Sequence, residues 1–255
     1  ATKDFPAEEF LMFATAQGNV KKTSMDQYDR TRRDGLIAIN LKDGDELISV
    51  KRVAKGEKVI MVSSAGKAIL WDESEARAMG RGTMGVRGMN VPADAHVLGM
   101  EIAKPGTDLF VITEKGYGKR TKIEEYPEHH RGGQGVYTIT MTHKKGLLSV
   151  MKIVGPDDEI MVVSEDGVIV RTPVKGISEL GRSTQGVKVM NVADKDKVCA
   201  VAIASTGKKK AKKAAPADEN QMGLLEEESE EGTLAIDDLD DLDDDLGDEG
   251  EATEE

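Results

Sequence analysis

The stretch Asp108–Val154 reads DLFVITEKGYGKRTKIEEYPEHHRGGQGVYTITMTHKKGLLSVMKIV, and it contains the unit from which most of the chain is built. It opens with an apolar run, Leu109–Ile112. After a polar loop, two further runs follow at Val136–Met141 and Leu147–Val154. Runs of β-branched and apolar residues separated by glycines and polar clusters indicate short strands. The stretch therefore predicts a small β-rich unit.

Three landmarks of this unit recur about 50 residues apart: a turn glycine, a glycine that opens another strand, and the start of a last apolar strand. They are Gly18, Gly66, Gly116 and Gly167; Gly35, Gly85, Gly135 and Gly186; and Leu47, Val97, Leu147 and Val198. Three landmarks with one period indicate internal repeats.

Each repeat offers four β-type runs, which in the first repeat are Phe10–Thr15, Val20–Met25, Leu36–Leu41 and Leu47–Val53. Four short strands in about 50 residues are typical of propeller blades. We therefore predict an all-β, propeller-like array of about four four-stranded blades within residues 1–206. The blades are expected at about 8–55, 56–104, 105–155 and 156–205, with short helical turns at Met25–Tyr28 and Glu73–Ala78.

The C-terminal part differs sharply in charge. From Gly207 onward there are 19 acidic and 5 basic side chains, whereas residues 1–206 hold 28 acidic and 30 basic ones. We predict a basic linker at 207–217 and a disordered acidic tail at 218–255, because such a composition cannot bury enough apolar surface to offset ordering entropy. One hypothesis is that the tail competes with an anionic partner for the body; deleting residues 207–255 would then tighten binding of that partner.

Composition narrows the class further. The single cysteine, Cys199, excludes a disulfide within the chain, favours a reducing compartment and is expected to pack in a core strand. No apolar stretch approaches the length of a membrane helix, and no signal peptide is visible. The chain starts with Ala inside a repeat, so we expect a fragment or processed piece.

Catalytic motifs are weak. His129 and His130 adjoin, and neighbours on a strand point opposite ways, so they make a poor metal pair. The glycine pattern at Gly80–Gly85 precedes a strand-like run instead of the helix that phosphate binding needs. We expect no catalytic residue and no metal site on this chain.

Basic residues, in contrast, recur with the period. A cation stands four residues after the turn glycine and four residues before the second glycine in most repeats; the exceptions are Leu70 and Thr31. Cations at regular intervals along a curved edge suit a continuous phosphate backbone. No aromatic platform accompanies them, which favours duplex over single-stranded DNA. The alternative is that these charges are solvated blade edges that discourage edge pairing.

Several strings in the repeats resemble one family: GYGKRT from Gly116, EEYPEHHRGGQGV from Glu124, RAMGRGTMGVRGMNV from Arg77 and GRSTQGVKVMNV from Gly181. They are similar to the C-terminal domain of DNA gyrase A, part of a bacterial type II topoisomerase, over about residues 8–204. The resemblance implies a β-pinwheel whose blades exchange a hairpin and whose basic rim wraps double-stranded DNA. The complete enzyme then introduces negative supercoils with ATP.

The resemblance also implies partners and cofactors that lie elsewhere. These are a dimeric N-terminal region of gyrase A, the gyrase B protein, and ATP and Mg bound on those other parts of the enzyme, all in the bacterial cytoplasm and without a membrane. The family ring usually has six blades, and its basic seven-residue box is missing here; HHRGGQG from His129 is the nearest echo. The cleavage tyrosine belongs to a region not present, so none of the tyrosines here is assigned that role.

Carried over residue by residue, the resemblance implies a set of phosphate contacts. They are Lys21, Lys22, Arg32, Arg33, Arg81, Arg87, Lys119, Arg120, Arg131, Arg171, Arg182 and Lys188. Two other functions remain open: the equivalent domain of topoisomerase IV, which selects DNA geometry, and a propeller that serves as a protein-interaction scaffold without affinity for DNA.

Overall fold

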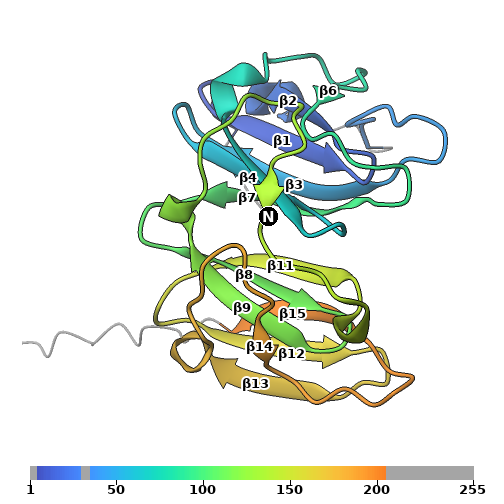
Figure 1. The fold of residues 1–255 in the computed structure, drawn as a ribbon. Coiled ribbons are helices and arrows are strands. Elements are labelled where there is room, and N and C mark those ends of the chain that lie inside the picture. The colour runs from blue at the N-terminus through green and yellow to red at the C-terminus, as the bar shows by residue number, and fades with distance from the viewer. Residues whose placement is uncertain (1–4, 30–34, 205–255) are drawn as a thin grey trace, which may run out of the picture. The chain divides into compact units, whose positions relative to one another are not determined.

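The structure is a computed structural model that describes residues 5–29 and 35–204. The predicted linker and acidic tail, like Arg32 and Arg33, lie outside the described residues. Within the described part, the secondary structure consists of strands and short 3₁₀ turns, with no α-helix. The all-β prediction is therefore confirmed (Figure 1).

The strands form four sheets, one for each repeat. In sheet order these are β3 (Leu47–Val53), β1 (Phe10–Thr15), β2 (Asn19–Ser24) and β6 (Val86–Arg87); β10 (Val136–Tyr137), β5 (Lys67–Asp72), β4 (Lys58–Ser63) and β7 (Val97–Ala103); β11 (Leu148–Val154), β8 (Asp108–Thr113), β9 (Tyr117–Lys122) and β14 (Val187–Lys188); and β13 (Ile169–Pro173), β12 (Glu159–Ser164) and β15 (Val198–Ala204). The 3₁₀ turns are η1 (Met25–Tyr28), η2 (Glu73–Glu75), η3 (Ile123–Glu125), η4 (His143–Lys145) and η5 (Val174–Gly176).

Each repeat donates one short strand to the sheet before it. β6 lies in the second repeat but pairs with β2 of the first, and β14 pairs with β9 (Figure 1). β10 pairs with β5 in the same way, and all three pairings are antiparallel. We call these three the exchanged strands. The exchange of strands between blades, which the family resemblance implied, is thus present in the molecule.

The first and last repeats differ from this rule. The predicted strand Leu36–Leu41 is wrong: the segment has no regular structure, and Ile37 is 71% exposed. Its counterparts form strands because β2, β5 or β9 stands beside them, and no described strand stands beside this segment. The last sheet likewise has three strands among the described residues, not the expected four, and its outer strand β13 is mostly exposed.

The hydrophobic core lies between successive repeats. One buried cluster joins the first two repeats around Met12, Met61 and Trp71. Equivalent clusters join the second repeat to the third and the third to the fourth. A single repeat therefore cannot bury its apolar surface alone, which is the physical basis of a repeat architecture.

The inner edge of each sheet is formed by β3, β7, β11 and β15, and each of these strands contacts the next. The prediction that Cys199 packs in the core is wrong, because it is exposed on β15. β7 and β11 each lie between two inner strands and keep most residues at least half-buried. β15 contacts only β11 among the described inner strands, so the residues of its free face, including Cys199, reach solvent.

Candidate nucleic-acid interface

The exchanged strands lie at the outer edge of their sheets. The inner strands contact one another, and β6, β10 and β14 occupy the opposite end of each four-stranded order. The first residues of β6 and β10, Val86 and Val136, pack against the shared cores, whereas the second residues of the three exchanged strands, Arg87, Tyr137 and Lys188, are exposed. Side chains on these strands are therefore placed where a long, stiff partner can reach several blades.

The second residue of each exchanged strand faces a residue just after the turn glycine of the preceding repeat. Arg87 lies opposite Asn19, Tyr137 opposite Lys67, and Lys188 opposite Tyr117. The Lys67 ammonium stands 5.2 Å from the Tyr137 ring centre, and the Lys188 ammonium stands 5.2 Å from the Tyr117 ring centre. Each pair thus holds one cation, although the strand that supplies it changes.

The loop before each exchanged strand adds an arginine: Arg81, Arg131 or Arg182. The guanidinium groups of Arg81 and Arg182 have no hydrogen bond or ion pair within the described part of the chain. Arg131 is held more tightly, because its Nε donates to the Glu75 carbonyl at 3.2 Å and its Nη1 to the Arg87 carbonyl at 2.5 Å. Every repeat junction therefore carries two surface cations, one in the loop and one on the paired strands.

Lys21 and Lys119 do not have the solvent-facing ammonium that the sequence predicted. Both side chains are fully buried. The Lys119 ammonium donates to the Gly181 carbonyl at 2.6 Å and to the Arg182 carbonyl at 2.8 Å, and Lys21 donates to the Arg81 carbonyl. Burial, with the positive charge of Arg81 or Arg182 nearby, lowers the pKa of each lysine to about 8. Burial explains the difference: neither ammonium is free to meet a phosphate.

Lys22 and Arg120 are also engaged within the protein. Lys22 is buried and forms an ion pair with Glu73 at 2.5 Å. Arg120 pairs with Asp108 at 2.5 Å and with Glu179 at 2.9 Å. These four positions follow the periodic pattern because the junction between repeats is periodic, and the prediction that they face solvent as phosphate contacts is corrected.

The remaining candidates lie on the surface. Arg87 and Lys188 are exposed on their exchanged strands. Arg171 is exposed on β13 and forms an ion pair with Glu159. The structure thus brings five of the predicted residues to the loops and exchanged strands of the outer edge: Arg81, Arg87, Arg131, Arg182 and Lys188.

Several basic residues near this edge were missed in the sequence. Lys67 was overlooked because it replaces the cation of the opposite strand. Lys144 and Lys145 follow no periodic position, since they belong to η4. The Lys145 ammonium lies 4.7 Å from the Tyr117 ring centre, and Lys115, Lys144 and Lys188 line a shallow cavity beside the same ring. The expectation that no aromatic ring accompanies the cations is therefore wrong at this junction.

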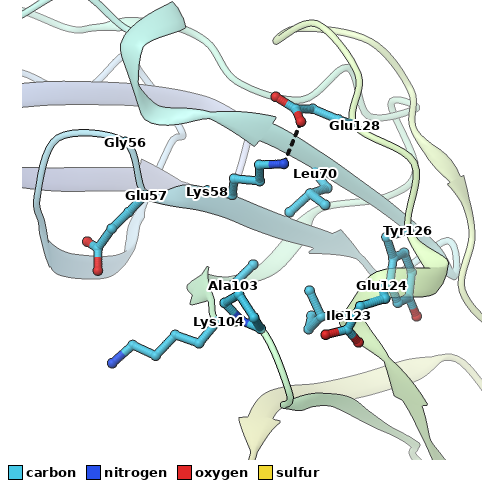
Figure 2. Close-up of a pocket in the computed structure, with 11 residues that line it drawn as sticks. Gly56, Glu57, Lys58, Leu70, Ala103, Lys104, Ile123, Glu124, Tyr126 and Glu128 are labelled. Carbon is cyan, nitrogen blue, oxygen red and sulfur yellow. Dashed lines mark hydrogen bonds and ion pairs between the residues drawn. The ribbon is translucent and has the colours of Figure 1, made fainter.

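A cavity of about 600 Å³ lies where the second and third repeats meet. Figure 2 shows the Lys58–Glu128 ion pair beside Leu70, with Ala103 and Ile123 across the cavity from that pair. The equivalent cavity between the third and fourth repeats measures about 190 Å³, and Arg120 stands there in place of Leu70. The lining of the larger cavity thus includes an apolar residue at a position that holds a long cation in the smaller one.

Residues 5–29 and 35–204 contain neither a metal-binding group nor a membrane-spanning helix. No group of three or more His, Cys, Asp or Glu side chains is placed to hold a metal ion. No helix there is long and apolar enough to cross a membrane.

The sequence pattern of the family described as "DNA gyrase C-terminal domain, beta-propeller" matches residues 9–54, 57–104, 107–144 and 158–205. The chain belongs to the DNA gyrase C-terminal domain family. The DNA gyrase A protein of Mycobacterium tuberculosis is 38% identical over 195 residues, which is 76% of this chain and 23% of that protein. The corresponding protein of Salmonella typhimurium is 40% identical over 188 residues, 74% of this chain and 21% of that protein.

Solved structures agree with membership of the gyrase family. A structure of the DNA gyrase A C-terminal domain superposes with a TM-score of 0.71 at 31% identity, covering 79% of this chain and 68% of that one. The C-terminal domain of DNA topoisomerase IV superposes with a TM-score of 0.75 at 25% identity, covering 79% and 64%. The fold of this chain is therefore the β-pinwheel of gyrase-type C-terminal domains, and the chain spans about a quarter of the length of the curated relatives.

Proposed function

We propose that this chain binds and wraps double-stranded DNA along the exchanged-strand edge of its blades. The observation that carries the proposal is the pair of surface cations at every junction: Arg81 with Arg87, Arg131 with Lys67, and Arg182 with Lys188. Phosphates repeat along a duplex, and a protein that neutralises them gains affinity from released counterions. Contacts of this kind position a duplex without reading its bases.

The proposal extends to a longer gyrase A protein. In that assembly, the wrapped DNA would be presented to an N-terminal region of the same protein and to gyrase B in the bacterial cytoplasm. ATP and Mg would bind on those other regions. Membership of the gyrase family supports this part, and the residues of this chain supply the DNA-binding surface.

The salt dependence of duplex binding tests the proposal. We expect the full chain to bind two unrelated duplexes equally, with log Kd rising steeply with log salt. Replacing Arg81, Arg87, Arg182 and Lys188 by Ala should reduce the slope by about four units, at about 0.9 for each phosphate contact. Lys55→Ala with Lys104→Ala, at exposed lysines of the turns that connect repeats, is the control and should leave the slope unchanged. A wild-type slope near zero would rule out phosphate binding.

A topoisomerase IV-like role is the second candidate, favoured by the superposition on that domain. The two roles differ in whether DNA is wrapped. Closing nicked circular DNA with ligase in the presence of a gyrase-type wrapping domain should shift the linking number. Binding without any such shift would favour the role that selects DNA geometry.

A further inference from the structure

Lys21 and Lys119 occupy the same place in their repeats, three residues after the turn glycine, on β2 and β9. Both are fully buried, and neither can contact DNA. Each reaches out of its own sheet into the next repeat. The acceptor that they share is the backbone carbonyl of a loop arginine: Arg81 for Lys21 and Arg182 for Lys119.

The Lys119 contact is complete. Its ammonium has three protons, and the three acceptors are the Gly181 carbonyl at 2.6 Å, the Arg182 carbonyl at 2.8 Å and the Thr184 hydroxyl at 3.0 Å. All three belong to one loop, directly before β14. Lys119 therefore fixes the backbone on both sides of the Arg182 Cα atom.

Packing alone does not require a lysine at this position. The second repeat places Ile69 there, and Ile69 is also fully buried. The Ile69 side chain packs against the loop of the next repeat: its Cδ1 atom would be 3.5 Å from a Cβ atom added to Gly133. An apolar side chain can therefore fill this junction. Burying an ammonium instead is costly unless it is well hydrogen-bonded.

The two kinds of junction hold the loop arginine differently. Beside Ile69, the Arg131 loop is fixed from outside by Glu75, which accepts from the Arg131 backbone N–H at 2.7 Å and from the side chain. The Nε and Nη1 atoms of Arg131 thus donate to the Glu75 and Arg87 carbonyls. Beside the lysines, the loop is fixed through its carbonyls, and the guanidinium groups of Arg81 and Arg182 have no hydrogen-bond partner among the described residues.

We propose that Lys21 and Lys119 are positioning residues for DNA binding, which hold Arg81 and Arg182 at the outer edge with their guanidinium groups available to phosphate. The inference rests on the proposed function. It assigns to two buried lysines an effect on salt-dependent binding that they exert only through the neighbouring arginine.

A double-mutant cycle on the full chain tests this, with Lys119→Met, Arg182→Ala and the combination, read as the slope of log Kd against log salt for a labelled duplex. Each single variant should reduce the slope by about one unit and weaken binding roughly four- to ten-fold, the share of one contact when ten to six contacts give micromolar binding. The double variant should lose about one unit, not two. Lys122→Met removes an exposed lysine from the same strand and is the matched control.

Trypsin cleavage after Arg182 gives a readout without DNA, and Lys119→Met should accelerate it several-fold while Lys122→Met does not. If Arg182→Ala weakens binding but Lys119→Met does not, or if their effects add, the inference is overturned and the proposed function stands. If the wild-type chain does not bind the duplex, or if Arg182→Ala leaves duplex binding unchanged, the proposed function itself fails. If Lys119→Met does not fold, the test is repeated with Lys119→Ile, which copies Ile69. A second cycle, with Lys21→Ile and Arg81→Ala, tests the first junction in the same way.

Discussion

The junction between the second and third repeats and the junction between the third and fourth share one backbone design but differ in the side chains that secure it. At the first of these, Ile69 and Leu70 are apolar, and an ion pair between Lys58 and Glu128 closes the surface. At the second, Lys119 and Arg120 stand in their places and bind carbonyls and carboxylates of the next repeat. The backbone bridge is the same, since Leu70 pairs with Glu128 as Arg120 pairs with Glu179.

The two junctions contain the same kinds of interaction, an ion pair and a cation beside an aromatic ring, but different strand positions supply the cation. Glu128 and Glu179 occupy corresponding positions. The partner of Glu179 is Arg120, inside a strand, whereas the partner of Glu128 is Lys58, at the start of a strand and at the position of Asp108. The same exchange occurs between Lys67 opposite Tyr137 and Tyr117 opposite Lys188. Charge at a junction is therefore a property of the pair of repeats.

Removing the glycine that admits each exchanged strand should have the largest effect. Gly135 has φ of 73°, and a Cβ atom there would stand 2.1 Å from the Ala68 carbonyl oxygen; at Gly186 the equivalent distance to Gly118 is 2.9 Å. We expect Gly135→Ala to cost about 3 to 4 kcal/mol and Gly186→Ala about 2 to 3, from left-handed backbone strain plus overpacking. Thermal melting measures both.

Gly35→Ala is the control for this comparison, because Gly35 has φ of 78° but no atom of the described residues lies within 4 Å of the added Cβ. It should cost about 1 kcal/mol. Equal losses at Gly35 and Gly135 would show that backbone conformation alone, and not the close approach of the neighbouring strand, limits these positions.

Exchanging the ion pairs should have a smaller effect. Arg120→Leu copies Leu70 and leaves Asp108, which is 8% exposed, without its cation; we expect a loss of about 2 kcal/mol, less than for a fully buried pair because Glu179 is partly solvated. In the opposite direction, Lys58→Asp should destabilise the neighbouring junction, and adding Leu70→Arg should restore part of the loss. The melting temperatures of the singles and the double measure this coupling, and purely additive shifts would contradict it.

The smallest effect is a pH dependence that comes from Lys119. Its pKa is lowered from 10.5 to about 8 in the folded chain, mainly by burial, so between those values the unfolded chain binds more protons. Stability from this group therefore rises as pH increases from about 8 to 10.5 and is independent of pH below that window. The melting temperature of the wild type relative to Lys119→Met should rise between pH 7 and pH 10. A constant difference would show that Lys119 is not desolvated.

The sequence predicted the fold well because its signals are local and repeated. Phe10–Thr15 and Leu47–Val53 are strands with the predicted bounds, and Met25–Tyr28 is the expected turn. The prediction of a strand at Leu36–Leu41 was wrong because a short exchanged strand forms only when a partner strand stands beside it. The prediction that Cys199 is buried was wrong because its burial depends on whether another inner strand covers that face of β15.

The candidate site was predicted less completely. A strand alternates its faces, and periodicity alone does not tell whether a recurring lysine points to solvent or into the next repeat. Lys21 and Lys119 recur because they bind the neighbouring loop, whereas Arg81 and Arg182 recur on the surface. Lys67 was not predicted because it lies on β5, the strand opposite the exchanged strand on which a cation was expected.

The exchanged strands also set an order of events during synthesis. β2 ends at Ser24, but the strand that completes its sheet, β6, begins at Val86, after two strands of the second repeat. A chain that leaves the ribosome from its N-terminus therefore keeps its newest sheet one strand short until most of the next repeat has emerged. Domains generally fold as the chain is made. Each blade would therefore be completed one at a time, when the exchanged strand of the following repeat has left the ribosome.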